Sequence, residues 1–148
     1  MLLNTLKTLF TRDLNRLKKE IGKYQDEKKL WYIEEEISNS GGNLCLHLIG
    51  NLNTYIGAEL GGSGYIRNRE AEFSLKGISQ AVLIEKIEET KMVIIQALDN
   101  LAEDQLQAEY PELVFEEKTS TEYLLVHLTT HLTYHLGQIN YHRRLLDK

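Results

Sequence analysis

The sequence contains one cysteine, Cys45, so a disulfide within a single chain is excluded. A protein without disulfides suits a reducing compartment, and we expect a cytoplasmic location. The single proline and the abundance of leucine, isoleucine, glutamate and lysine favour helices over strands. No apolar run approaches the roughly 20 residues that a membrane span needs. The formal charge of −5 argues against nucleic acid and anionic membranes as general partners.

Apolar residues recur at steps of three and four in four long segments, which predicts four amphipathic helices. The first segment, 3–24, alternates polar and apolar positions and therefore does not resemble a signal peptide, whose apolar residues are consecutive. The second covers 43–60 and the third 79–101. The fourth begins with a capping box formed by Thr119 and Glu122 and continues towards the C-terminal end.

The connections between these segments are polar and rich in glycine and serine, and only 113–115 reads as a short extended piece. A lone strand does not make a sheet. Four amphipathic helices without a transmembrane run bury their apolar stripes against one another. The sequence therefore predicts that residues 1–148 form a single all-α domain, an antiparallel four-helix bundle.

Four of the five histidines lie on the last predicted helix, and helical geometry groups them on one face. At about 100° per residue, His127, His131, His135 and His142 point within roughly 80° of one another, in the stripe that also carries apolar residues. A buried imidazole needs partners for its ring nitrogens. Two imidazoles one turn apart, such as His131 and His135, can occupy adjacent positions around a metal ion.

His47 is the only histidine outside the last helix and is thus the only candidate for a third imidazole ligand. It lies at the edge of the apolar stripe of its helix, in the direction of Asn51, Thr54 and Ala58, which are small or polar. Three protein ligands beside a polar groove leave an open position, as a catalytic metal requires. Alternatively, His47 bonds a backbone carbonyl and the other two histidines bond nearby Tyr or Glu. The spacing alone favours neither interpretation.

The remaining polar residues near this face have simpler interpretations. Three histidines at successive i, i+4 positions span about 12 Å, so we expect His127 to orient a ligand or to pack in the core rather than to bind the ion. His142 is expected to be a partly buried surface residue. Tyr134 and Gln138 are expected near the site, where, with Asn51, they can hold a ligand.

Two features outside the histidine face also need an interpretation. Cys45 points about 160° from His47 on the same helix and is expected to be a small buried residue. Arg67, Arg69 and Glu72 indicate a loop held by salt bridges, and a role in recognising an anionic substrate is the alternative.

The sequence resembles the DinB-like family of metal-binding four-helix bundles over nearly the whole chain, and three stretches carry the resemblance. They are 39–51, which includes His47; 67–73, typical of one branch of the family; and 127–138, which carries H-x-x-x-H and then Gly-Gln. The resemblance implies that His47, His131 and His135 bind a divalent metal, usually nickel or zinc. Many relatives carry an arginine directly after the last ligand, where this sequence has Leu136.

The resemblance also implies a class of reaction. Better-characterised relatives are thiol-S-transferases that use bacillithiol or mycothiol, including a mycothiol-dependent maleylpyruvate isomerase, whereas the branch resembled here has no assigned substrate. We expect a metal-dependent enzyme that acts by thiol-S-transfer or hydrolysis on a small molecule, with a low-molecular-weight thiol as a candidate. The alternatives are a non-catalytic, stress-associated protein whose bundle is braced by metal, and an interaction module without catalysis. Relatives tend to dimerise, so a homodimer is expected.

Overall fold

The computed structural model describes all residues, 1–148, and its regular elements are all helical. The only β-type pairing is an isolated bridge between Glu109 and Ser120, so the predicted extended piece at 113–115 forms no strand. No helix combines the length and hydropathy that crossing a bilayer requires. The elements are α1 (Leu2–Lys23), η1 (Glu27–Trp31), α2 (Gly41–Leu52), the π-helical η2 (Asn53–Ala58), α3 (Arg69–Ser74), α4 (Gln80–Asp99), η3 (Glu103–Gln107) and α5 (Thr121–Leu146).

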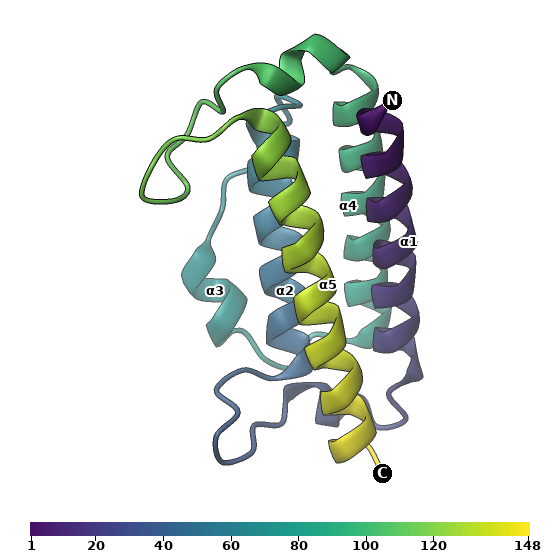
Figure 1. Cartoon of the computed structure of the whole chain (residues 1–148). Helices are drawn as coiled ribbons and strands as arrows, with labels where there is room; N and C mark the ends of the chain where they lie inside the picture. The colour runs from purple at the N-terminus through teal and green to yellow at the C-terminus, as the bar shows by residue number, and fades with distance from the viewer.

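The four long helices lie side by side, and the short α3 was not predicted (Figure 1). Helix α1 packs against α4 and α5, while α2 packs against α5 and, together with η2, against α4. Helix α3 covers the outer side of α2. As a result all 12 residues of α2 are buried, including His47. The side chains of α2 therefore point into protein on every side.

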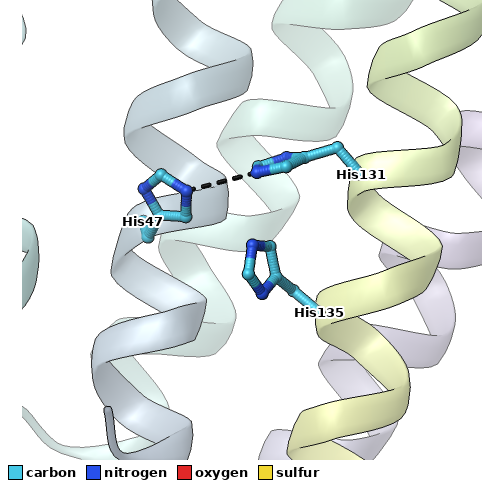
Figure 2. Close-up of side chains that lie close together, drawn as sticks. All are labelled: His47, His131 and His135. Carbon is cyan, nitrogen blue, oxygen red and sulfur yellow. Dashed lines mark hydrogen bonds between the residues drawn. The ribbon is translucent and has the colours of Figure 1, made fainter. Parts of the chain in front are cut away.

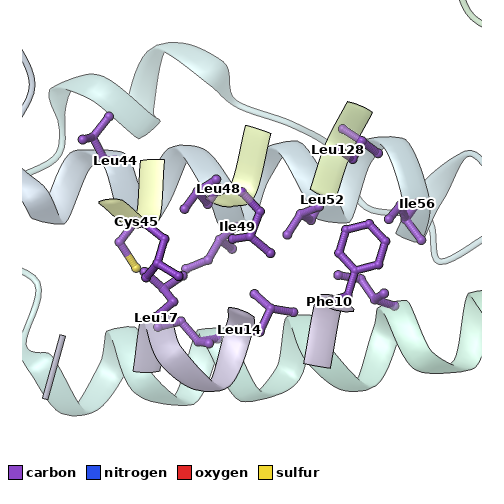
Figure 3. Packing of buried hydrophobic residues seen from close by; sticks show 14 of the residues in the cluster. Phe10, Leu14, Leu17, Leu44, Cys45, Leu48, Ile49, Leu52, Ile56 and Leu128 are labelled. Atoms are coloured by element: carbon purple, nitrogen blue, oxygen red, sulfur yellow. The ribbon is translucent and has the colours of Figure 1, made fainter. Parts of the chain in front are cut away.

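The apolar stripe predicted on the first helix is confirmed as core. Figure 3 shows Phe10, Leu14 and Leu17 of α1 meeting side chains of α2, among them Leu48 and Leu52, in the centre of the molecule. Burying one side chain of this size contributes about 1.5–3 kcal/mol, so this packing holds the long helices together. The buried residues of the stripe are Leu3, Leu6, Phe10, Leu14, Leu17, Ile21 and Tyr24.

Serine caps set the starts of three helices. Ser40 and Ser79 cap α2 and α4, so α2 starts two residues before the predicted 43. The capping box predicted for Thr119 and Glu122 is wrong, because the cap of α5 is Ser120, whose hydroxyl accepts a hydrogen bond from the backbone nitrogen of Tyr123 (3.1 Å). The carbonyl of Thr119 accepts a hydrogen bond from the backbone nitrogen of Tyr110 (2.8 Å). This contact keeps Thr119 outside the helix.

His142 is buried, with 5% of its surface exposed, and not a partly buried surface residue as predicted. Its Nε2 donates to the carbonyl of Tyr32 (2.9 Å), so its Nδ1 accepts from the hydroxyl of Tyr24 (2.7 Å). Burial lowers the pKa of His142, against the opposing effect of the bond to Tyr32. These bonds connect the end of α5 to the chain after α1 and to the loop before α2.

Replacing Tyr24 with phenylalanine tests this connection. Tyr24→Phe leaves Nδ1 of His142 buried without a donor, so we expect the free energy of unfolding to fall by about 1–3 kcal/mol. Urea denaturation at neutral pH measures the change. Tyr65→Phe, which removes the hydroxyl of a partly exposed tyrosine, is the matched control and should change stability by less than about 0.5 kcal/mol. If Tyr24→Phe were as stable as Tyr65→Phe, the result would contradict a hydrogen bond from Tyr24 to Nδ1 of His142.

Candidate metal centre

Three imidazole rings converge between α2 and α5. His47 comes from the middle of α2, and His131 and His135 come from successive turns of α5 (Figure 2). One nitrogen from each ring lies within 4.8 Å of the others. The closest pair is Nε2 of His47 and Nε2 of His131, 3.3 Å apart. Residues 84 positions apart in the sequence thus share one site, as the sequence predicted.

A buried carboxylate fixes the orientation of the His47 ring. Nδ1 of His47 lies 3.1 Å from Oε1 of Glu72, and both side chains are more than nine-tenths buried. A carboxylate only accepts hydrogen bonds, so Nδ1 carries the proton and donates it. In the neutral ring Nε2 then has a free lone pair, directed at His131. Carboxylate–histidine pairs of this kind orient ligands in many metal sites.

Arg67 holds Glu72 in place by two parallel hydrogen bonds. Its Nε lies 2.9 Å from Oε2 and its Nη2 lies 3.0 Å from Oε1 of the carboxylate. Burial raises the pKa of Glu72, but the hydrogen bonds from His47 and Arg67 outweigh it and leave the pKa below its ordinary value. Glu72 is therefore ionised at neutral pH. The predicted salt bridge is confirmed for Arg67 and Glu72. Arg69 forms no salt bridge, and Arg69 and Glu72 lie in α3 rather than in the predicted loop. The contact of Glu72 with His47 was not foreseen.

The backbone of α2 and the end of α3 are shaped for this contact. A Cβ atom added to Gly50 would lie 1.8 Å from Oε2 of Glu72, so only glycine admits the carboxylate here. One turn before His47, Nδ2 of Asn43 donates to the carbonyls of Glu72 (2.9 Å) and Leu75 (2.8 Å). These bonds anchor α3 on α2 and set the depth at which the carboxylate lies.

The two histidines of α5 have less polar surroundings. Burial lowers the pKa of His135, although its Nδ1 donates to Oε1 of Gln138 at 2.7 Å, which opposes the shift. Burial, with a smaller contribution from the neighbouring histidines, lowers the pKa of His131 to about 4. Nδ1 of His131 is buried and has no hydrogen-bond partner. Both rings are therefore neutral at physiological pH, the protonation state that binds metal.

The arrangement fits a transition metal ion. Bonds of about 2.0–2.1 Å to imidazole nitrogens place neighbouring ligands of a tetrahedral ion about 3.3–3.4 Å apart. The distance between the two Nε2 atoms of His47 and His131 is 3.3 Å. The third ring, of His135, stands nearly perpendicular to both, at 87° and 86°. Three neutral nitrogen donors and no fourth protein ligand in the cluster are typical of a site with an open position.

The other residues expected at the site occupy distinct places. His127 is outside the converging set; its ring is stacked on that of His131 at 6.3 Å and packs against Phe115. Asn51 lines a cavity beside His47 and His131. The hydroxyl of Thr54 donates to the carbonyl of Gly50 (2.7 Å), so this proton is already used.

Tyr134 and Gln138 lie on the other side of the cluster, and two further residues have no part in it. Tyr134 and Gln138 line a second cavity together with His135. Cys45 is fully buried, as predicted, and burial raises the pKa of its thiol to about 12, so it stays a thiol. Leu136, where many relatives carry arginine, is buried in the core.

Glu72 is the residue at the site whose role the sequence did not indicate. The chain has 22 acidic residues, and no periodicity distinguishes the one that meets His47. The available signal is chemical, because a metal-binding histidine usually donates its second ring proton to a carboxylate or carbonyl. This rule predicts a carboxylate or carbonyl partner for His47 but does not say which residue provides it. The partner comes from α3, which is too short to show a helical pattern in the sequence.

A substitution at Glu72 tests its role. Glu72→Gln retains the shape of the side chain but removes the charge that holds the proton of His47, so we expect metal affinity to fall about 10–100-fold. Isothermal titration with zinc or nickel measures the affinity, and circular dichroism verifies that the variant is folded. Glu70→Gln, which changes an exposed residue of the same helix, should bind like the wild type. Unchanged affinity in Glu72→Gln would refute the role.

Comparisons with known proteins identify the family of the chain. No curated protein matches the sequence. A family model described as "Protein of unknown function (DUF1572)" matches residues 1–148. The three converging histidines lie within the matched region. The chain therefore belongs to DUF1572, which is a DinB-like family.

Proposed function

We propose that the chain binds one divalent transition metal ion through His47, His131 and His135. Nickel and zinc are the leading candidates because the resemblance to the DinB-like family implies them. A three-histidine site can also take copper, according to supply. We also propose that α1, α2, α4 and α5 form an antiparallel four-helix bundle of the DinB-like type that holds the three rings. The observation that supports this most is the approach of three imidazole nitrogens to within 4.8 Å of one another.

An ion held by three neutral imidazoles supplies Lewis acidity that acidifies a water molecule or a thiol at its open position. Two residues, Glu72 and Gln138, hold histidine ligands in the orientation that the ion needs. Glu72, ionised and paired with Arg67, keeps the lone pair of the His47 Nε2 directed inward. Gln138 does the same for His135 by accepting its Nδ1 proton. The protein is accordingly proposed to be a metal-dependent enzyme.

Two cavities flank the histidines, which favours a reaction with two substrates. One, of about 180 Å³, is lined by His47 and His131 together with polar side chains. The other, of about 470 Å³, is lined by His135 and by several apolar residues, among them Leu44 and Leu145. A thiol and an electrophilic acceptor can each occupy one cavity, whereas hydrolysis needs one substrate and water. Thiol-S-transfer with a low-molecular-weight thiol is therefore the leading reaction, and hydrolysis is the second.

Elemental analysis of purified protein tests the metal site. We expect about one equivalent of nickel or zinc in the wild type and little in His135→Ala, because two imidazoles alone bind these ions weakly. His127→Ala is the matched control: it removes a histidine of the same helix face that lies outside the cluster, so metal content should be unchanged. Equal metal content in the wild type and His135→Ala would remove the ligand assignment.

The same preparations separate the possible reactions. Loss of free thiol in the presence of an electrophilic acceptor, by metal-loaded wild type but not by His135→Ala, would support thiol transfer. Turnover of esters or amides without a thiol would support hydrolysis instead. A large rise in melting temperature with metal, without turnover of either kind, would favour the alternative of a non-catalytic bundle that the ion braces between α2 and α5.

A homodimer in the cytoplasm is the expected working form. Exposed apolar side chains recur at steps of three, four, seven and eight along α5, so they lie on one face. Scattered apolar residues on a surface are ordinary, but a stripe of them along one helix face favours an interaction surface. The buried, reduced Cys45 suits a cytoplasmic location. The residues of the stripe are Tyr123, Val126, Tyr134, Tyr141 and Leu145.

Analytical ultracentrifugation tests the dimer. We expect the wild type to sediment as a dimer at micromolar concentration. Tyr141→Glu should shift it to a monomer, because it places a charge within the stripe. Glu85→Gln, on the exposed surface of α4, should leave the dimer intact. A monomeric wild type would end the proposal, with no effect on the metal assignment.

A further inference from the structure

The cavity of about 180 Å³ beside His47 and His131 has an unusual charge balance. Four further polar side chains line it, and none of its lining residues is acidic. The charge of Glu72, behind His47, is offset by Arg67. The polar side chains of the lining are those of Asn51, Arg67, Arg69 and His127.

Asn51 is a buried polar group without a partner. Only 7% of its surface is exposed, and its Oδ1 is buried without a hydrogen bond. Buried carboxamides in folded proteins are almost always hydrogen-bonded, so an unbonded one calls for an explanation. Asn51 lies one helical turn after His47 and lines the same cavity. The Nδ2 of Asn51 forms no hydrogen bond within the chain, so its N–H groups can donate to a ligand in the cavity.

Arg69 supplies an uncompensated positive charge at the same cavity. It is the first residue of α3 and forms no ion pair, in contrast to Arg67, whose Nε and Nη2 are both bound to Glu72. A guanidinium group presents several N–H donors in a planar fork that matches the two oxygens of a carboxylate. The unpaired guanidinium of Arg69 can balance one negative charge on a ligand. The size of the cavity limits the ligand to a small group.

We infer that this cavity binds the carboxylate of a small-molecule ligand, with Arg69 as its ion-pair partner and Asn51 as a hydrogen-bond donor. The carboxylate would hold the rest of the ligand against His47 and His131. The inference rests on the proposed function only for the identification of that ligand as the substrate, because the anion subsite consists of side chains of the chain itself. It specifies a substrate class, a small carboxylate, for the reaction proposed above.

Nuclear magnetic resonance with acetate as the probe tests the inference. In the metal-free protein, acetate should shift the side-chain N–H signals of Asn51 and Arg69 in a saturable way. In Arg69→Gln the dissociation constant for acetate should rise about ten-fold or more, because a charged hydrogen bond is lost. Arg69→Lys, which keeps the charge without the fork, should lie between the two. Arg144→Gln, which removes the same charge from an exposed part of α5, is the matched control and should bind acetate normally.

Three results would overturn the inference. They are the absence of shifts at Asn51 with saturating acetate, equal affinity in the wild type and Arg69→Gln, and tighter binding of inorganic phosphate than of acetate. Zinc titration of the same samples keeps the two proposals apart. Failure to bind zinc would refute the metal site, while the acetate titration of metal-free protein would still decide the carboxylate subsite. Normal zinc binding without acetate binding would refute the subsite alone.

Discussion

Glu72 places a carboxylate beside the ring of His47 at a depth where an unpaired charge is costly. Arg67 offsets that charge with two hydrogen bonds, and the carboxylate in turn accepts the Nδ1 proton of His47. The rest of the site depends on this series of contacts, because it determines which nitrogen of His47 faces α5. Removing one member leaves a buried charge or an unrestrained imidazole, so the three residues act as one cooperative unit.

Burial acts on the two histidines of α5, and hydrogen bonding acts on His47 of α2. Both interactions prepare the rings to bind a cation. On α5, burial keeps His131 and His135 neutral by lowering their pKa values. On α2, the contact with Glu72 directs the free lone pair of His47 inward. Glu72 and Gln138 accept the Nδ1 protons of His47 and His135, which leaves the Nε2 lone pairs of these two rings free for a cation. Preparation of this kind reduces the reorganisation that binding requires.

The sequence predicted the long helices because their apolar residues recur periodically. Periodicity also placed His131 and His135 on one face, whereas the resemblance to the DinB-like family favoured metal binding by these two residues and His47. The stripe of α1 repeats every three or four residues, and a single histidine outside α5 made His47 the only third imidazole. Helix starts were harder, because the cap of α5 depends on Thr119 pairing with Tyr110, a tertiary contact. Glu72 and His142 escaped prediction for the same reason, because each contact is tertiary and one of its two members, Glu72 or Tyr32, lies in a segment without periodicity.

Helix α2 has no solvent-facing side chain, since all 12 of its residues are buried. A replacement there disturbs packing on every side, so this helix tolerates little variation. The segments that cover it are less constrained, because Arg69, at the start of α3, is exposed and Val114, in the chain before α5, is only half-buried where they border the polar cavity. Substitutions in this outer cover can therefore alter what the cavity admits without disturbing the helix that carries His47.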